Sequence, residues 1–352
     1  MKFTPLWTSV IPVLSFLPSA HAWGQEGHAI VATIAELHLG PTVLPTLCSI
    51  LNLPDARAQP CSLASVASWA DEIKSDKRWS GTAGLHFANA VADHPPQLCL
   101  FPGDEGWSGP KDANVLGGIR NTTNLLGQWV QQGSDLSDPV ASESLKFLIH
   151  FLGDIHMPLH LTGRERGGND VRVMWGIKEV RLHKMWDEEI VARAIETTPS
   201  EWDQPLSPEI ERHLHGNEYD RLIRKILVEG IKRTWADKVE SWTRCPAPSL
   251  PSSLGDDQIV LQPRWEVGDT DDGDVCPWHW ASPLHELVCE WVWPKQLDEP
   301  PYNENLGPLL QLDTDEYAGK ITREWVVEEL FAKGGLRLAM ILNFIFAPQQ
   351  DY

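Results

Sequence analysis

The chain of 352 residues has few basic side chains relative to its acidic ones. Lys and Arg number 29 against 49 Asp and Glu, which gives a formal net charge of −20 at pH 7. This balance argues against a nucleic-acid binder that works through a broad basic groove. An anionic substrate would instead have to be attracted by local positive charge, which bound metal ions can supply.

The sequence also has no Cys-x-x-Cys pair and, beyond its N-terminus, no apolar stretch long enough to cross a membrane. Its six cysteines are an even number, which favours disulfides over a thiolate metal site in an oxidising compartment. Six cysteines allow fifteen pairings. Among these we favour Cys48 with Cys61, Cys245 with Cys276, and a long-range bond between Cys99 and Cys289.

Residues 1–22 have the pattern of a secretory signal peptide. Lys2 is their only charge, the segment from Leu6 to Leu17 is largely apolar, and Ala20-His21-Ala22 fits the small-x-small cleavage pattern. We therefore expect a secreted protein whose single domain spans residues 23–352 and begins at Trp23. Asn121-Thr122-Thr123 is an N-glycosylation sequon, so Asn121 is a predicted glycosylation site.

The spacing of apolar residues indicates a mostly helical chain. Helices are expected over residues 30–37, 63–74, 115–131, 145–154, 183–194 and 218–242. Val171, Val173 and Trp175 occupy alternate positions, with the charged Arg172 between the two valines, which predicts a short strand or hairpin between residues 170 and 181. Residues 315–346 are expected to form two helices that meet at Gly334-Gly335.

Residues 245–276 differ from the rest of the chain, being rich in Pro, Ser, Gly and acidic side chains. We interpret them as a disulfide-closed acidic insertion at the surface. A functional lid is a less favoured interpretation, and a calcium site within residues 269–274 lacks the EF-hand spacing.

The stretch LKFLIHFLGDIHMPLH, residues 145–160, is the most informative in the chain. In a helix, His150 and Asp154 lie one turn apart on the same face. An imidazole and a carboxylate at that spacing make half of a site for a zinc-like ion. Pro158 would end the helix, and the following turn could bring His160 back towards the same centre. The alternative is a core helix whose polar residues hydrogen-bond to each other.

Other segments carry the same residue types. His183 and Asp187 repeat the i, i+4 spacing, Asp71 occurs in SWADEIK, His86 in LHF, and His28 in WGQEGH. Each of these is unremarkable alone, but their ordered combination is poorly explained by chance.

This ordered set resembles the secreted single-strand-specific zinc nucleases and 3′-nucleotidases of fungi and plants, which share a fold with zinc-dependent bacterial phospholipase C. The resemblance covers residues 23–352 and extends through RGGN at 166–169, LHKMWD at 182–187, WAS at 280–282, Cys289 and AKGGLRLA at 332–339. It implies an all-α, single-domain multi-helix bundle of the zinc-dependent phospholipase C and nuclease type, with a short β-hairpin and disulfide-closed loops.

The resemblance also implies a site for three Zn²⁺. The first ion would be held by Asp71, His86, His150 and Asp154. Its neighbour would be held by the α-amino nitrogen and carbonyl of Trp23, by His28 and by the other oxygen of Asp154. The third would be held by His160, His183 and Asp187. The same ligand types suit manganese or cobalt, so the identity of the metal rests on the resemblance.

The implied activity is hydrolysis of phosphodiester bonds in single-stranded DNA and RNA to 5′-phosphorylated products, with 3′-nucleotidase activity, by a monomer. A metal-bridged hydroxide would attack phosphorus in line. The resemblance gives catalytic roles to Asp71, Asp154, Asn169 and Lys74, and substrate-binding roles to Phe87 and Asn89. We favour the functional role for Phe87 over a core residue and for Asn169 over a turn residue, whereas a functional Lys74 and a solvated one are equally open. Asn89 departs from the aspartate common in the family, so base preference is left open.

Two other functions are alternatives. A phospholipase C acting on phospholipid head groups usually has Glu at the position of Asp154, and a zinc-stabilised protein without catalysis would not need all nine ligand positions. The remaining histidines are interpreted as surface or supporting residues, with His156 the best candidate for supporting the ligands; they are His38, His94, His156, His213, His215, His279 and His285.

Overall fold

The computed structural model describes residues 23–53, 61–102, 106–110, 112–133, 136, 138–246, 271, 275–302 and 308–348. The expected signal peptide, residues 1–22, and most of the acidic insertion lie outside the described residues.

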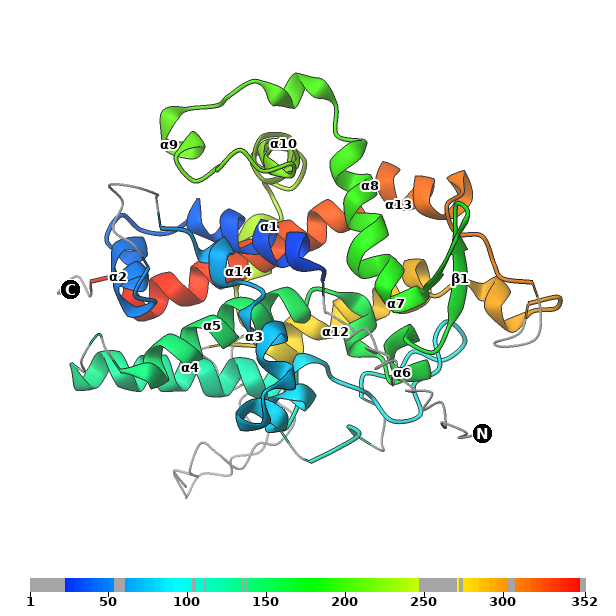
Figure 1. Ribbon diagram of the computed structural model, residues 1–352, viewed down its shortest axis with the longest axis horizontal. Helices are drawn as coiled ribbons and strands as arrows, with labels where there is room; N and C mark the ends of the chain where they lie inside the picture. The colour runs from blue at the N-terminus through cyan, green and yellow to red at the C-terminus, as the bar shows by residue number, and fades with distance from the viewer. Residues whose placement is uncertain are drawn as a thin grey trace, which may run out of the picture.

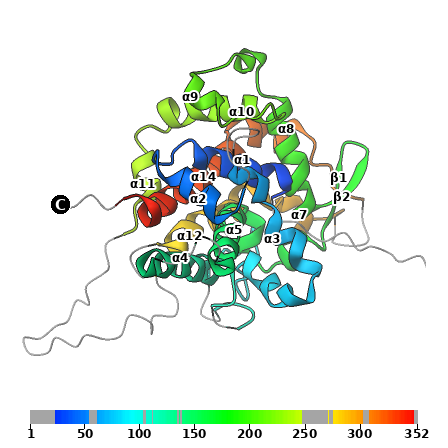
Figure 2. The same ribbon diagram turned by 60° about the vertical axis from the view of Figure 1, so that its left-hand side comes forward.

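Helices dominate the fold and lie in three tiers. Helix α1 (Gln25–Glu36) and helix α14 (Val326–Phe346) lie side by side through the middle of the molecule. Helices α4 (Val115–Gln132) and α5 (Pro139–Asp154) form a pair below them, and α10 (Asp220–Lys225) lies above (Figures 1 and 2). The predicted all-helical class is confirmed.

Local sequence signals explain where the lower pair begins and ends. The Asn114 side chain accepts a hydrogen bond from Gly117 N at the start of α4, and Gly133 ends that helix with a left-handed φ of 61°. Asp138 caps α5 in the same way, and Pro139 occupies its first position.

Helix α14 contradicts one prediction. Gly334-Gly335 does not separate two helices, because α14 is continuous from Val326 to Phe346. A Cβ added at Gly335 would lie 2.4 Å from Ile34 Cγ2, so the glycine is needed for the close approach of α14 to α1. The chain breaks instead at Trp325, whose φ is 56°, just after α13 (Lys320–Arg323).

Three segments predicted as single helices are helical but divided. Residues 63–74 form η1 (Leu63–Val66), α3 (Trp69–Glu72) and η2 (Ile73–Ser75). Residues 183–194 belong to α7 (Leu182–Lys184), the π-helical turn η5 (Met185–Glu189) and α8 (Ile190–Glu196). Residues 218–242 contain α10, the π-helical segment η7 (Ile226–Thr234) and α11 (Val239–Thr243).

The expected hairpin is present, with β1 (Arg172–Trp175) antiparallel to β2 (Lys178–Arg181) and Val173 paired with Val180. The other elements are α2 (Val43–Ile50), η3 (Lys77–His86), η4 (Pro158–Leu161), α6 (Glu165–Gly168), η6 (Ser200–Asp203), α9 (Pro208–Glu211), α12 (Pro277–Leu287), η8 (Val288–Val292), η9 (Lys295–Asp298) and η10 (Asp315–Gly319).

Across the described residues, no helix combines the length and apolar character that a membrane span requires.

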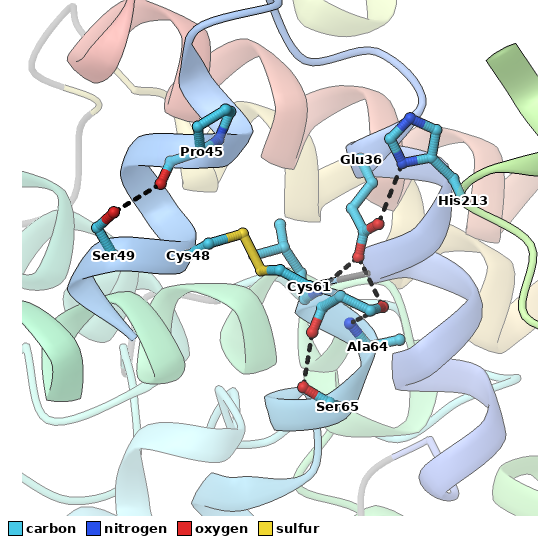
Figure 3. The surroundings of a disulfide bond; sticks show 10 residues. Glu36, Pro45, Cys48, Ser49, Cys61, Ala64, Ser65 and His213 are labelled. Atoms are coloured by element: carbon cyan, nitrogen blue, oxygen red, sulfur yellow. Dashed lines mark hydrogen bonds and ion pairs between the residues drawn. A yellow bond between two sulfur atoms is a disulfide. The ribbon is translucent and has the colours of Figure 1, made fainter. Parts of the chain in front are cut away.

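Three disulfides join Cys48 to Cys61, Cys99 to Cys289, and Cys245 to Cys276, which are the pairs favoured from the sequence. The first lies beside the buried carboxylate of Glu36 (Figure 3). Glu36 accepts hydrogen bonds from Ser62 Oγ at 2.8 Å and from the Leu63 amide, and its other oxygen lies 3.4 Å from His213 Nδ1. These contacts hold the start of η1, and therefore the approach to α3, against α1.

Candidate metal centre

The ends of several helices meet at a buried group of five histidines and three aspartates. His28 comes from α1, Asp71 from α3, His86 from the end of η3, His150 and Asp154 from α5, His160 from η4, His183 from α7 and Asp187 from η5. All eight are at most 6 % exposed. They form three groups whose nitrogen and oxygen atoms lie within 4.8 Å of one another: His28, His150 and Asp154; Asp71, His86 and His150; and His160, His183 and Asp187.

Asp154, a member of the first group, also contacts the second. Its Oδ1 is 3.3 Å from His28 Nε2, and its Oδ2 is 2.9 Å from His86 Nδ1 and 3.3 Å from His150 Nε2. The two oxygens of one carboxylate therefore face different histidines.

Asp71 completes the group around His86 and His150. Its Oδ1 is 3.6 Å from His86 Nδ1 and 3.4 Å from His150 Nε2. Lys74, one turn further along, makes an ion pair with the same oxygen. The predicted ligand Asp71 and the predicted catalytic residue Lys74 are thus in direct contact.

His160, His183 and Asp187 form a group of their own. The rings of His160 and His183 stack with centroids 5.0 Å apart, and His183 Nε2 lies 3.5 Å from Asp187 Oδ2. Asp187 belongs to the π-helical turn η5, an irregularity that is frequent at functional sites.

Backbone carbonyls orient the imidazoles. The Nδ1 atoms of His150, His160 and His183 lie 2.7, 2.6 and 2.7 Å from carbonyls of Ala67, His86 and Gly167. With Nδ1 donating to the backbone, Nε2 is left as the ligand atom of the neutral ring, which is the arrangement typical of metal-binding histidines.

Trp23 is brought to the same place by the start of α1. Its side chain is fully buried against Phe331, and its carbonyl oxygen lies 2.5 Å from His28 Nδ1. The Gly24 amide donates to the carbonyl of Asp187 at 2.9 Å, which ties this segment to the third group.

The two central carboxylates are ionised despite their burial. Burial opposes ionisation of Asp154, but the attraction of His150 and His86 holds its pKa well below the usual range. Asp71 is similar, because His150 and Lys74 outweigh the effect of burial and lower its pKa. Both are therefore acceptors at neutral pH.

In the third group, burial is the main influence on the pKa values of His160, His183 and Asp187. Burial lowers the pKa of His160 to about 3 and that of His183 to about 4, so both rings are neutral at pH 7. Burial, together with repulsion from Asp71, raises the pKa of Asp187 well above its usual range. A bound cation would reverse that shift by favouring the carboxylate.

Both oxygens of Asp154 and Oδ1 of Asp187 are buried acceptors that make no well-directed hydrogen bond, and Nε2 of His28 makes none either. Buried acceptors without partners are costly in free energy and rare. Cations would satisfy them, and imidazole with carboxylate is a donor set that suits zinc. The residues therefore fit a multinuclear metal site.

A cleft of about 180 Å³ opens beside the centre, lined in part by His86, His160 and His183. The predicted substrate residues Phe87, Asn89 and Asn169 also line it, together with Lys74. Phe87 is 38 % exposed, so it is not a core residue. The Asn169 amide donates to the carbonyl of Arg166 at 2.9 Å, and Arg166 itself lines the cleft.

Arg166, on the cleft wall, was not predicted from the sequence to have a role. The signal that could have singled it out is a cation next to two glycines in an acidic chain. His156, the favoured supporting residue, is buried, but its ring nitrogens lie 2.7 Å from Leu152 O and 2.7 Å from Arg337 Nη1 rather than against a ligand. His285 is also buried, with its Nε2 2.9 Å from Asp93.

The fold and the site together define a class: an all-helical protein with clustered imidazole and carboxylate ligands beside an open cleft, as in metal-dependent hydrolases. A family model described as S1/P1 Nuclease matches residues 23–347. Endonuclease 3 of Arabidopsis thaliana is 29 % identical over 348 residues, which cover 98 % of this chain and 96 % of that protein.

Two fungal relatives show the same likeness. Nuclease S1 of Aspergillus oryzae (strain ATCC 42149 / RIB 40) is 29 % identical over 339 residues, 94 % of each chain. Nuclease P1 of Penicillium citrinum is 35 % identical over 167 residues, 47 % of this chain and 57 % of that one. The chain belongs to the S1/P1 nuclease family and is a hydrolytic nuclease. This membership does not favour a phospholipase C or a catalytically silent protein.

Proposed function

We propose that the protein is a secreted endonuclease that cleaves single-stranded DNA and RNA to 5′-phosphorylated products, acts also as a 3′-nucleotidase, and uses three Zn²⁺. The observation that carries the proposal is the position of Asp154, whose two oxygens face different histidines beside a cleft with an exposed aromatic ring. The names of the relatives, which include Nuclease S1, support the same reaction class.

The ligands divide among the ions as follows. One zinc is assigned to Asp71, His86, His150 and Asp154, and a second to the Trp23 backbone, His28 and Asp154. The third is assigned to His160, His183 and Asp187. The third set matches one cluster of nearby ligand atoms. The other two clusters have His150 in common, and Asp154, a member of the cluster with His28, also lies 2.9 Å from His86 of the other cluster.

When bound, the ions supply an activated water at neutral pH and neutralise charge on the phosphate. The chain's own residues position the substrate. The Asn169 amide, on the cleft wall, donates a hydrogen bond to a phosphate oxygen through its second N–H, while the first keeps its bond to the Arg166 carbonyl. Lys74 holds Asp71 in place and adds positive charge at the same edge of the cleft.

Single-strand preference follows from Phe87. Its ring is 38 % exposed on the cleft wall, where an unpaired base can stack on it. Such stacking contributes about 1–3 kcal/mol per base and depends little on sequence. A base inside a duplex is not available for this contact. Asn89, on the same wall, both donates and accepts hydrogen bonds, so it can contact the base edge.

The remaining assignments concern the chain as a whole. Residues 1–22 are proposed to be a cleaved signal peptide and residues 23–352 one nuclease domain, active as a monomer, with residues 245–276 an acidic insertion. Asn121 is exposed on α4, which is compatible with N-glycosylation there.

The test is a digestion of matched single-stranded and duplex DNA before and after chelation. We expect rapid loss of the single strand, slow loss of the duplex, 5′-phosphate ends, no activity after chelation, and recovery with added zinc. Equal cleavage of both substrates, or cleavage that survives chelation, would overturn the proposal. Phosphatidylcholine serves as the control substrate for the phospholipase alternative.

A further inference from the structure

Arg166 is a cation on the cleft wall whose side chain has no role in the mechanism proposed above. Its backbone lies in the left-handed region with φ of 55°, within a run of positive φ at Glu165 (45°), Gly167 (64°) and Gly168 (78°). A residue with a side chain adopts this conformation at a cost in free energy and keeps it where the surrounding structure imposes it.

The turn that carries Arg166 is fixed by the metal centre itself. The carbonyl of Gly167 accepts the Nδ1 proton of His183 at 2.7 Å, and a Cβ added at Gly167 would lie 2.5 Å from Leu159 O. The Arg166 carbonyl accepts a hydrogen bond from Asn169 at 2.9 Å. Hydrogen bonds from two residues of the site, His183 and Asn169, therefore fix the stretch of backbone from which the Arg166 side chain extends.

The Arg166 side chain is available to a ligand. It is 77 % exposed and pairs with Asp170 at 3.3 Å, and Asp170 is itself 45 % exposed. An exposed pair of this kind contributes little to stability, so a phosphate can replace the carboxylate as its partner. Arginine is suited to the task because its planar fork binds phosphate through two parallel hydrogen bonds.

The two cations on the cleft wall, Lys74 and Arg166, differ in their contacts and exposure, which favours a separate role for each. Among the described lining residues the permanent cations are Lys74 and Arg166, and Lys74 is 20 % exposed and held by Asp71. Lys74 is thus tied to the metal ligands, whereas Arg166 lies further towards solvent. A phosphate next to the scissile one in a single strand would meet Arg166.

We propose that Arg166 binds a phosphate flanking the scissile bond and thereby favours oligonucleotides over 3′-mononucleotides, which lack that phosphate. This inference rests on the proposed nuclease function. It makes Arg166 a specificity-determining residue, and Asp170 a competitor for the same guanidinium in the free enzyme.

The test compares Arg166→Ala with the parent enzyme on a short single-stranded oligonucleotide and on a 3′-mononucleotide, at several salt concentrations. The ratio of kcat/KM for the oligonucleotide to that for the mononucleotide should fall about tenfold, mainly through KM. The slope of log affinity against log salt should become shallower by about 0.7, the value for one phosphate contact in a single strand.

Three further variants sharpen the result. Arg166→Lys should recover part of the salt slope, and Asp170→Asn should lower KM for the oligonucleotide. Arg233→Ala is the matched control, because Arg233 is 66 % exposed in a similar i, i+4 pair with Glu229 but does not line the cleft. It should change neither substrate ratio nor salt slope.

An unchanged substrate ratio and salt slope in Arg166→Ala would overturn the inference. Equal losses on both substrates would also overturn it, since they would mean that Arg166 only supports the turn. Failure of the parent enzyme to cleave either substrate would instead refute the proposed function, so the two failures are distinguishable.

Discussion

His150, His160 and His183 each place their Nδ1 against a backbone carbonyl, and this sets which nitrogen is free for a metal. The acceptor for His183 is Gly167, a residue with a left-handed φ of 64°. Backbone carbonyls thus set how these ligands point, and two of the three belong to residues without a ligand atom in the side chain, Ala67 and Gly167.

Gly167→Ala should therefore weaken the third metal group. The added Cβ would lie 2.5 Å from Leu159 O and 3.3 Å from His183 Nδ1, so the turn and the imidazole would have to move. We expect zinc affinity at that group to fall by about 10- to 100-fold, as for other losses of a supporting contact. Competitive titration with a zinc chelator measures it.

Gly216→Ala is the control for this substitution. Gly216 has a φ of 78° but no atom within 4 Å of an added Cβ, so it carries the backbone penalty without the clash. If both variants retained zinc equally well, the orienting role of Gly167 would be wrong.

Individual residues also show which parts of the site could be predicted from the sequence. His150 with Asp154, and His183 with Asp187, were predictable because residues four apart in a helix share a face. Arg166 was not, because its place on the cleft wall depends on four successive positive φ values that no periodic pattern announces.

At the scale of elements, the pairing of α1 with α14 shows the limit of local signals. Gly334-Gly335 has the composition of a helix break, yet both glycines lie inside α14 where α1 approaches. The partner in this contact, Ile34, is 301 residues away in sequence from Gly335, so local propensity could not reveal it. The break occurs at Trp325, which no turn-forming residue marks.

Gly335→Ala should destabilise the protein by about 1–3 kcal/mol, the usual effect of overpacking. An added Cβ would lie 2.4 Å from Ile34 Cγ2 and 3.1 Å from the Val31 carbonyl, which outweighs the better helix propensity of alanine. Chemical denaturation of the zinc-loaded protein measures the free energy of unfolding.

Gly127→Ala in α4 supplies the comparison, because nothing lies within 4 Å of its added Cβ. It should stabilise the protein by up to about 1 kcal/mol. Equal effects of the two substitutions would show that α1 and α14 do not need the glycine.

At the scale of the whole molecule, the N-terminal segment of the proposed mature chain is part of the centre. Trp23 is fully buried, its carbonyl lies against His28, and Gly24 is bonded to Asp187. A free α-amine has a pKa near 8, so a metal displaces its proton at modest cost, whereas an amide nitrogen is a poor ligand. Removal of the signal peptide would thus complete the site.

One extra residue before Trp23 of the mature protein should therefore abolish activity and remove about one zinc per chain. Metal analysis of purified protein and a single-strand digestion measure the two effects. The same residue added after Tyr352 is the control and should leave both unchanged. Full activity with three zincs in the N-terminally extended protein would refute the role of the α-amine.

An acidic chain that cleaves polyanions needs positive charge at its active site. The net charge of −20 argues against a broad basic groove, and the permanent cations among the described residues that line the cleft are Lys74 and Arg166. Composition predicted the need for local charge and the resemblance pointed to Lys74, whereas Arg166 is identified by the fold alone.

In the proposed three-zinc centre Asp154 bridges two of the ions, and Asp154→Asn removes the charge that this bridge requires. Zinc content, measured together with single-strand cleavage, should fall from three per chain to one, with a loss of activity of more than about 100-fold. Asp220→Asn, which alters a buried carboxylate bonded to Gly216 and Asn217 instead, should keep all three ions. Loss of one zinc or none from Asp154→Asn, with cleavage retained, would contradict the bridging assignment.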